Sequence, residues 1–500
     1  MKSGRGFLIT LYVWVMFASV LPASAEIYTG TGDYRQVQTD GGDNKSEGPK
    51  LIRYYHSVWN VSGMFGNGWL TDYDLVVEKR DNDTLALMEP CSGEKTVFSR
   101  SPEDVSAKSV QRVGGIIYKS GKCGCQKIEV TSTGYVHTFG NTTKVFDLQG
   151  KLLSLRDGTS YSIDVARDKQ GAVSSLTDSR GVALVLSRND KGQIQEIIRD
   201  GQPFLKYSYA KDGRLASVTT TSDVGYNYEY DAQGLMSHFK YGHMDESISY
   251  YGPDQQHKVM THNDGLGYSD LYSYSKVSAD GLTHSASITI MDNDEVLSHS
   301  EVTYFDKREK DGTVWLQKVV EKTDGEVTKE TTYAKSSLPI EVKEYGETTR
   351  FEYDKLSRLI RKESPHKLVE YIYENKFGKV SIVRRSDPGL AGSLIETKYE
   401  YDSIGNLTKA SDNDGSRVAL TYDADNRIKT MNTEDATLSF LYNKRGKPVH
   451  IELAGVGAID VTYDDSARIT STGGKNSLIC SLKVSTVFQV LLNLIREAKQ

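Results

Sequence analysis

The sequence predicts an all-β fold: a repeat array of β-hairpins that forms a spiral or open shell of strands, followed by a short C-terminal helix. Three observations support this prediction. Glycines recur every 21 residues, a Tyr-Asp-x-x-Gly pattern recurs with them, and the segments between them alternate apolar and polar residues. A fixed period of about 20 to 50 residues is typical of a repeat architecture rather than of one irregular globule.

The period is clearest in two stretches, the first array at residues 146–251 and the second array at residues 333–470. Glycines 21 residues apart mark the first array, and tyrosines 20 or 21 residues apart mark the end of the second. The residues that define the repeat are Gly150, Gly171, Gly192, Tyr209, Gly213, Tyr230, Asp231, Gly234, Tyr353, Asp354, Tyr401, Asp402, Gly405, Tyr422, Asp423, Tyr442, Gly446, Tyr463 and Asp464.

Each unit has a simple physical interpretation. The run Tyr226–Tyr230 alternates with period 2, which is typical of a half-buried strand. The Asp-x-x-Gly that follows is typical of a turn, because Asp accepts a hydrogen bond from the backbone N–H two residues on and Gly adopts positive φ without steric cost. Asn426 fits the glycine position, since Asn tolerates the left-handed region. A unit of this length accommodates two strands of about six residues and two turns.

The segments outside the arrays follow in chain order. Residues 1–25 are predicted to be a secretory signal peptide, with Lys2 and Arg5, an apolar stretch, and small residues before Glu26. Residues 26–50 are polar and are expected to form a mobile leader.

Three further segments complete the chain. Residues 51–145 are expected to form a β-rich entry module, and residues 252–332 either degenerate repeats or an inserted β unit. In the tail, residues 471–500, apolar residues recur at helical spacing, with Thr486 as the predicted cap and Gln489 as its capping-box partner. Three interpretations stay open: the helix covers the open end of the array, it docks a partner, or the tail follows a gene truncation.

Charge and composition exclude some functions and leave others open. The net charge of −6 argues against nucleic acid as the main partner, because such a partner requires a basic face. No further membrane span is expected after residues 1–25. The 31 tyrosines, against 13 phenylalanines, suit strands and stacking between repeats, and exposed rings could also serve as platforms for sugars.

The sequence predicts no catalytic site, no cofactor and no metal site. It contains no nucleophile elbow, zinc-protease helix or phosphate-binding loop, and the histidines match no metal spacing. A carboxylate pair suited to glycoside hydrolysis is left open, although the repeat explains most aspartates as turn formers. In an exported protein a disulfide is expected, most simply between Cys91 and either Cys123 or Cys125.

The Tyr-Asp units resemble the YD repeat of the Rhs family, which also occurs in wall-associated bacterial proteins, toxin-complex C subunits and teneurins. The run Arg53–Ser57 followed by Gly63–Trp69 is similar to the segment that leads into that repeat region. The resemblance implies a β-spiral that closes into a hollow shell, often around a toxic domain, with repeats also described as carbohydrate-binding.

The chain also departs from that family. It is short for a closed shell, and no end-of-core motif with a toxin domain follows the repeats; Asp387–Leu390 matches such a motif only superficially.

The function expected from these features is that of an exported Rhs-type protein (periplasmic, cell-surface or secreted) with no catalysis of its own. It would act as a binding or shell protein for a cell-surface glycan or a polypeptide. Two alternatives are a half-shell that acts with a separately encoded toxin, and a glycan-active enzyme. The ligand-binding residues are unknown at this point.

Overall fold

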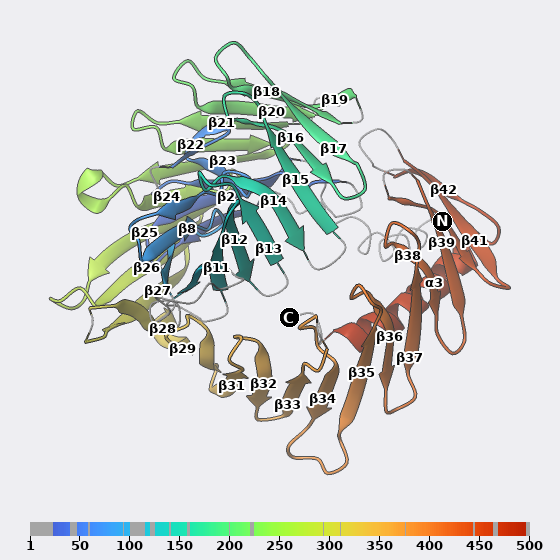
Figure 1. Cartoon of the computed structure of the whole chain (residues 1–500). Helices are drawn as coiled ribbons and strands as arrows, with labels where there is room; N and C mark the ends of the chain where they lie inside the picture. Colours follow the sequence, from blue (N-terminus) through green and yellow to red (C-terminus); the bar gives the residue numbers. More distant parts are fainter. Residues whose placement is uncertain are drawn as a thin grey trace, which may run out of the picture.

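The computed structural model consists of one long antiparallel sheet that winds as a spiral, a small inner sheet and one helix (Figure 1). It describes residues 24–40, 48–58, 61–93, 95–100, 116–120, 126–139, 142–157, 161–199, 201–220, 225–293, 295–310, 312–375, 377–443, 446–463 and 469–496. The predicted all-β repeat array with a C-terminal helix is therefore confirmed.

In the main sheet each strand from β7 to β42 pairs antiparallel with its neighbour in the sequence. The sheet closes on itself where Val76 forms an isolated bridge with Lys151 and the Val77 N–H donates to the Gly150 carbonyl at 2.8 Å. The strands up to the end of the first array are β7 (Val77–Lys79), β8 (Thr84–Met88), β9 (Lys95–Arg100), β10 (Ile116–Ser120), β11 (Gln126–Thr131), β12 (Gly134–Phe139), β13 (Thr142–Phe146), β14 (Leu152–Asp157), β15 (Tyr161–Arg167), β16 (Val173–Asp178), β17 (Ala183–Arg188), β18 (Ile194–Arg199), β19 (Gln202–Tyr209), β20 (Leu215–Thr220), β21 (Gly225–Tyr230), β22 (Met236–Tyr241) and β23 (Met244–Tyr250).

Residues 252–332 continue the same sheet, with a short 3-10 helix η1 (Pro253–Gln255) and some longer strands, such as the 14-residue β27. The strands here are β24 (Val259–Asn263), β25 (Tyr268–Lys276), β26 (Thr283–Asp292), β27 (Glu295–Arg308), β28 (Val314–Thr323) and β29 (Glu326–Tyr333). The second array follows with β30 (Pro339–Glu344), β31 (Glu347–Tyr353), β32 (Leu359–Ser364), β33 (Lys367–Ile372), β34 (Ile382–Ser386), β35 (Ile395–Tyr401), β36 (Leu407–Asp412), β37 (Arg417–Tyr422), β38 (Ile428–Asn432), β39 (Thr437–Tyr442), β40 (Pro448–Leu453), β41 (Gly457–Tyr463) and β42 (Ile469–Gly473).

A four-stranded inner sheet, ordered β1–β2–β3–β6, packs against the first array (Figure 1). Its strands are β1 (Ser24–Tyr28), β2 (Asp33–Thr39), β3 (Ile52–His56) and β6 (Trp69–Thr71), and the hairpin β4 (Ser62–Gly63) and β5 (Gly66–Asn67) lies between the last two. Residues 33–39 were expected to belong to a mobile leader, and this expectation is wrong because they form a buried strand. Most of these residues are polar and do not alternate regularly with apolar ones, so the sequence pattern did not predict a strand.

Helix α3 (Ser477–Ile495) packs on strands β36, β37, β40 and β41 with five buried residues. These are Cys480, Val484, Val487, Leu491 and Leu494. The predicted helix start is wrong: Thr486 lies inside the helix and its hydroxyl bonds the Leu482 carbonyl at 3.2 Å. The long apolar stretch, with a mean hydropathy of 1.8, also meets the length and composition criterion for a membrane span, which the sequence analysis did not expect.

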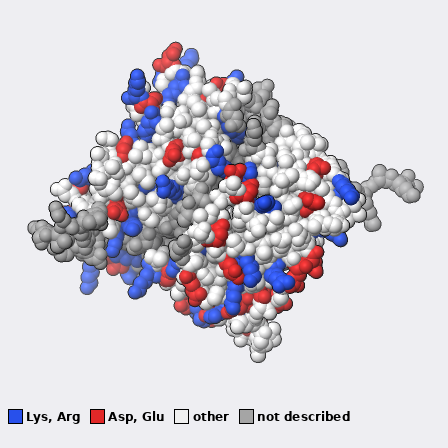
Figure 2. All heavy atoms as spheres, turned by 45° about the vertical axis from the view of Figure 1, so that its right-hand side comes forward, with Lys and Arg blue, Asp and Glu red and all other residues white. Residues whose placement is uncertain are grey.

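Two separate hydrophobic cores result. One joins the inner sheet to the array strands up to Tyr272, and the other joins α3 to strands from Val369 onward. Strands β30, β31 and β32 between them contain no buried side chain. On these strands Arg361 contacts Glu352 and Glu370, each at 3.7 Å. Figure 2 shows basic and acidic side chains interspersed on the face of the molecule that it displays. Exposed ion pairs of this kind contribute little stability individually.

Candidate functional site

The repeated aspartates are held inside their own turns. The Asp231 carboxylate accepts the backbone N–H groups of Gln233 at 2.9 Å and Leu235 at 2.8 Å. The same pair of bonds, to residues two and four positions on, recurs at Asp354, Asp402 and Asp423. Burial raises the pKa of Asp402, but its hydrogen bonds to the backbone and to Asn406 outweigh burial and hold that pKa below its usual value. These carboxylates are committed to turn structure.

The glycine position of each turn has a positive φ, as predicted. Its values run from 77° at Gly192 to 91° at Gly405 among Gly150, Gly171, Gly192, Gly213, Gly234, Gly405 and Gly446. Asn426 occupies the same position with φ 60°, which confirms its predicted role. Asp464 lies outside the described residues.

The repeated tyrosines join each unit to the preceding one. The Tyr422 hydroxyl donates to the Leu407 carbonyl at 2.7 Å, and burial raises the pKa of Tyr422 to about 12, which keeps the hydroxyl protonated. Equivalent bonds run from Tyr230 to Leu215, Tyr250 to Met236, Tyr353 to Pro339, Tyr373 to Leu359, Tyr401 to Val380, Tyr442 to Ile428 and Tyr463 to Pro448. These bonds give the tyrosine of the motif a structural role.

Two units of the first array use arginine in the tyrosine position, which the sequence analysis missed. Arg167 donates to the Leu152 carbonyl at 3.2 Å and Arg188 donates to the Val173 carbonyl at 3.0 Å. Both carbonyls lie 15 residues back, as in the bond from Tyr230. The signal was present in the sequence, because each arginine directly precedes an Asp or Asn turn.

Tyr209 is an exception among these positions. Its hydroxyl is buried and has no hydrogen-bond partner among the described residues, and burial raises its pKa. The ring lines a cavity of about 400 Å³ together with Arg167, Arg188 and Asp74. Asp74 is engaged by the N–H groups of Met64 and Thr71, each at 2.8 Å.

A buried ion pair of the inner sheet, between Arg53 and Asp40, contacts the first array through two tyrosine hydroxyls. Arg53 is fully buried, pairs with Asp40 through Nε, and donates from a second nitrogen to Asp40 at 2.8 Å and to the Tyr228 hydroxyl at 3.2 Å. Tyr207 donates to the same Asp40 carboxylate at 2.8 Å, and the guanidinium lies 4.6 Å from the Trp69 ring centroid. Burial lowers the pKa of Arg53, but the charge of Asp40 more than offsets this and raises it.

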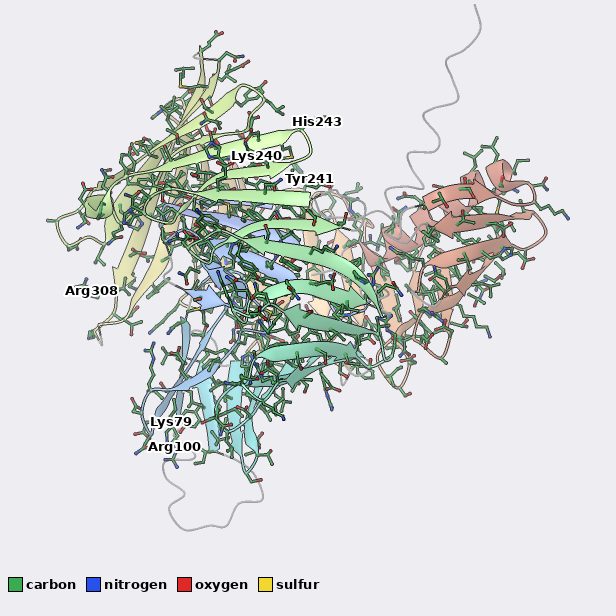
Figure 3. All side chains as sticks on the ribbon, turned by 90° about the horizontal axis from the view of Figure 1, so that it is seen from above. Lys79, Arg100, Lys240, Tyr241, His243 and Arg308 are labelled. Carbon is green, nitrogen blue, oxygen red and sulfur yellow. The ribbon has the colours of Figure 1, made fainter. Side chains whose placement is uncertain are left out.

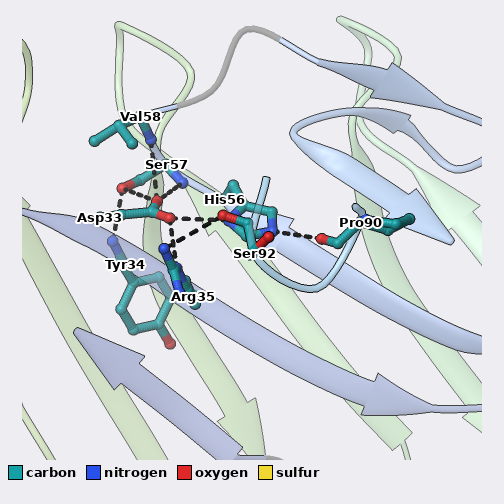
Figure 4. A network of polar contacts seen from close by, with 8 residues as sticks. All are labelled: Asp33, Tyr34, Arg35, His56, Ser57, Val58, Pro90 and Ser92. Atoms are coloured by element: carbon teal, nitrogen blue, oxygen red, sulfur yellow. Dashed lines mark hydrogen bonds and ion pairs between the residues drawn. The ribbon is translucent and has the colours of Figure 1, made fainter. Parts of the chain in front are cut away.

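A second network lies within the inner sheet, around Asp33 (Figure 4). Asp33 accepts from Arg35 at 2.8 Å, from the Ser57 N–H at 2.9 Å, and faces His56 Nδ1 at 2.9 Å. Burial raises the pKa of Asp33, but bonds and charges from His56 and Arg35 outweigh it and lower that pKa. His56 Nε2 bonds the Pro90 carbonyl at 2.8 Å. Because both histidine nitrogens are engaged elsewhere, His56 does not activate the Ser57 hydroxyl as a nucleophile.

A third buried contact joins His262 on β24 to Glu246 on β23 at 3.2 Å. Burial lowers the pKa of His262, but bonds to Asp270 and Glu246 outweigh it and raise the pKa to about 9. Tyr34 of the inner sheet donates to the same Glu246 at 3.4 Å. This cluster therefore connects the two sheets.

The remaining predicted groups were cysteines and metal ligands. Among the described residues Cys91 is exposed and forms no disulfide, and its predicted partners Cys123 and Cys125 lie outside the described residues, so that disulfide stays a prediction. Within the described ranges no group of three or more His, Cys, Asp or Glu side chains is arranged to hold a metal ion. The structure thus brings the described repeat residues into one ladder, in which the tyrosine hydroxyls other than that of Tyr209 bond to backbone of the preceding unit.

A comparison with protein-family models decides the family. The model described as Teneurin YD-shell matches residues 126–472, which is more than half of the chain. The chain belongs to the teneurin YD-shell family. A comparison with curated protein sequences finds no match.

Two solved structures resemble this YD shell. The Photorhabdus luminescens Tc holotoxin pore carrying a TccC3 mutation is 12% identical, covers 88% of this chain and 27% of its own, and has a TM-score of 0.43. A TcdB2-TccC3-TEV crystal structure is 12% identical, covers 94% of this chain and 29% of its own, and has a TM-score of 0.43. This YD-shell chain thus spans under a third of the length of either solved chain.

Proposed function

We propose that this protein is an exported, non-catalytic YD-shell protein that binds or encloses a ligand, either a polypeptide or a glycan, in the cell envelope or outside the cell. Its support is the family match together with the ladder of repeat residues. In that ladder the tyrosine hydroxyls and aspartate carboxylates, the groups best suited to chemistry, are bonded to backbone. Residues 1–25 support export through their basic start, apolar stretch and small-residue end.

Export and binding are tested separately. Residues 1–25 fused to alkaline phosphatase are expected to give periplasmic or secreted activity, and the fusion without them is expected to give none. The chain from residue 26 is then immobilised and exposed to purified envelope polysaccharides and to co-expressed polypeptides from neighbouring genes. Binding of none of these would refute the binding proposal, whatever the outcome of the export assay.

A second candidate is a half-shell that acts with a separately encoded toxin. The family match favours it, because the matching model describes a shell. Co-expression with a neighbouring toxin gene is expected to give a complex whose toxin is protected from added protease. A toxin that co-purifies but is cleaved as fast as the free toxin would contradict enclosure.

The glycan-active alternative has no support among the described residues. A sugar-release assay on envelope polysaccharides is expected to give no product above a buffer control. Release that disappears in an Asp-to-Asn variant would establish catalysis and refute the non-catalytic assignment.

A further inference from the structure

Five hairpin tips of the main sheet, between β22 and β31, form a row along one edge. Successive strands of an antiparallel sheet run in opposite directions, so every second connection lies at the same edge. The Asp-x-x-Gly turns lie at the opposite edge. Figure 3 shows the tip labelled Tyr241 and His243 at the far end of the sheet from Arg308, which ends β27. We call this row the rim; its described residues are 241–245, 264–268, 292–293, 295–297, 323–327 and 344–347.

Backbone contacts hold the tips of the rim side by side. A Cβ added to Gly265 would lie 2.4 Å from the Asp245 carbonyl oxygen, so the first two tips touch. The Asn293 N–H donates to the Gly267 carbonyl at 3.0 Å and joins the third tip to the second. The last two tips are set back against the neighbouring strand, where the Asp324 N–H donates to His299 at 2.7 Å and the Tyr345 N–H donates to Thr328 at 3.0 Å. The rim is therefore a connected row, in which the first three tips touch one another and the last two are stepped back along the neighbouring strand.

The rim exposes large apolar side chains on every tip. Their exposed fractions are 38% for Met244, 71% for Leu266, 48% for Tyr268, 59% for Val296, 52% for Leu297, 51% for Val327 and 81% for Tyr345. Single exposed apolar residues are ordinary on a protein surface, but a contiguous row of them marks an interaction site.

The negative charge of the rim indicates which class of partner can bind there. Its described residues include no lysine or arginine and the carboxylates Asp245, Asp264, Asp292, Glu295, Asp324, Glu326, Glu344 and Glu347. Lys240, Lys322 and Lys343 directly precede three of the tips, and Lys240 lies 3.4 Å from the Asp245 carboxylate, so the excess of negative charge is carried by the other carboxylates. An anionic membrane surface would be repelled by these carboxylates. A second copy of the rim would place like charges opposite one another, which is unfavourable. A partner with positive charge beside apolar groups satisfies both features of the rim.

We propose that the rim docks a polypeptide segment in which apolar side chains alternate with lysine or arginine. The apolar side chains of the segment cover Leu266, Val296 and Tyr345, and its cations pair with Glu295 and Glu326. The rim lies at the sheet edge opposite the YD turns. Docking of a peptide there does not depend on whether the shell encloses cargo.

The test uses the full chain from residue 26 and a fluorescent 14-residue peptide of alternating lysine and leucine. The matched probe replaces each lysine with glutamate. Fluorescence anisotropy is expected to show saturable binding of the lysine peptide and none of the glutamate peptide. The rim variant Leu266→Ser, Val296→Ser, Tyr345→Ser is expected to bind the lysine peptide roughly tenfold more weakly or worse.

A control at the opposite edge separates docking from general attraction to an acidic protein. Leu356 lies in a YD turn with an exposed fraction of 57%, and Leu148 lies in another at 62%. The variant Leu148→Ser, Leu356→Ser is expected to bind as the unaltered chain does. Equal weakening in both variants, or binding of the glutamate peptide, would overturn the proposal. So would binding to phosphatidylserine vesicles, or concentration-dependent dimerisation, that the rim variant abolishes while peptide binding is unchanged.

Discussion

Replacement of a repeat tyrosine by phenylalanine tests whether the hydroxyl ladder stabilises the array. Tyr250→Phe removes the 2.8 Å bond from the hydroxyl to the Met236 carbonyl and leaves the ring in place. A typical intramolecular hydrogen bond contributes about 0.5 to 1.5 kcal/mol net, so we expect a loss near 1 kcal/mol. With a denaturant slope of about 1 to 3 kcal/mol per molar urea, the midpoint should fall by roughly 0.3 to 1 M.

Tyr209→Phe provides the matched control, because Tyr209 occupies the same position two units earlier. Its buried hydroxyl has no hydrogen-bond partner in the part of the chain that the structure describes. Removal of the hydroxyl therefore removes an unsatisfied group and should leave stability unchanged or slightly higher. Urea unfolding followed by tyrosine fluorescence and far-UV circular dichroism measures both variants. Equal losses in the two variants would show that ring packing, rather than the hydroxyl bond, joins the units.

Three further predictions concern the core, the turns and pH. Arg53→Met leaves its carboxylate partner buried and unpaired, and should cost about 3 to 5 kcal/mol in urea unfolding. Gly150→Ala should cost more than Gly192→Ala by thermal melting; both have positive φ, but only the first places a Cβ against a backbone carbonyl oxygen, at 2.1 Å. His262, with a pKa raised to about 9, contributes stability that is fully present below its unfolded pKa of about 6.5 and is lost as pH rises through 9. His262→Gln should therefore flatten the unfolding free energy between about pH 6.5 and 9.5, and an unchanged slope would contradict this assignment.

The sequence predicted the array because its determinants are local. Positive φ at Gly234 and Asn426, and the carboxylate bonds of Asp231, depend only on residues within one turn. The arginines in the tyrosine position were missed because two different side chains make the same bond there. The sequence places each arginine directly before a turn, and the carbonyl 15 residues back shows that its bond is equivalent to the tyrosine bond.

Strand β2 of the inner sheet could not be predicted because its contacts are distant in the sequence. Gln36 and Gln38 are nearly fully buried although they are polar, so neither hydropathy nor periodicity indicated a strand. Their burial follows from the position of β2 against the array. The start of α3 was misplaced for a different reason. A capping-box pattern at Thr486 suggested an N-terminus, whereas the helix begins at Ser477 after Asn476 in the left-handed conformation.

The order of strands in the main sheet has a consequence for how the protein folds. Every strand from β7 to β42 pairs with its immediate neighbour in sequence, so each hairpin can form as soon as the chain is synthesised, with little loop-closure entropy. The bond from Arg53 to Tyr228, in contrast, joins residues 175 positions apart. Residues 33–56 are synthesised before the array strands that they contact, so they can dock only after those strands have formed. The inner sheet therefore completes the first core late, although it precedes the array in the chain.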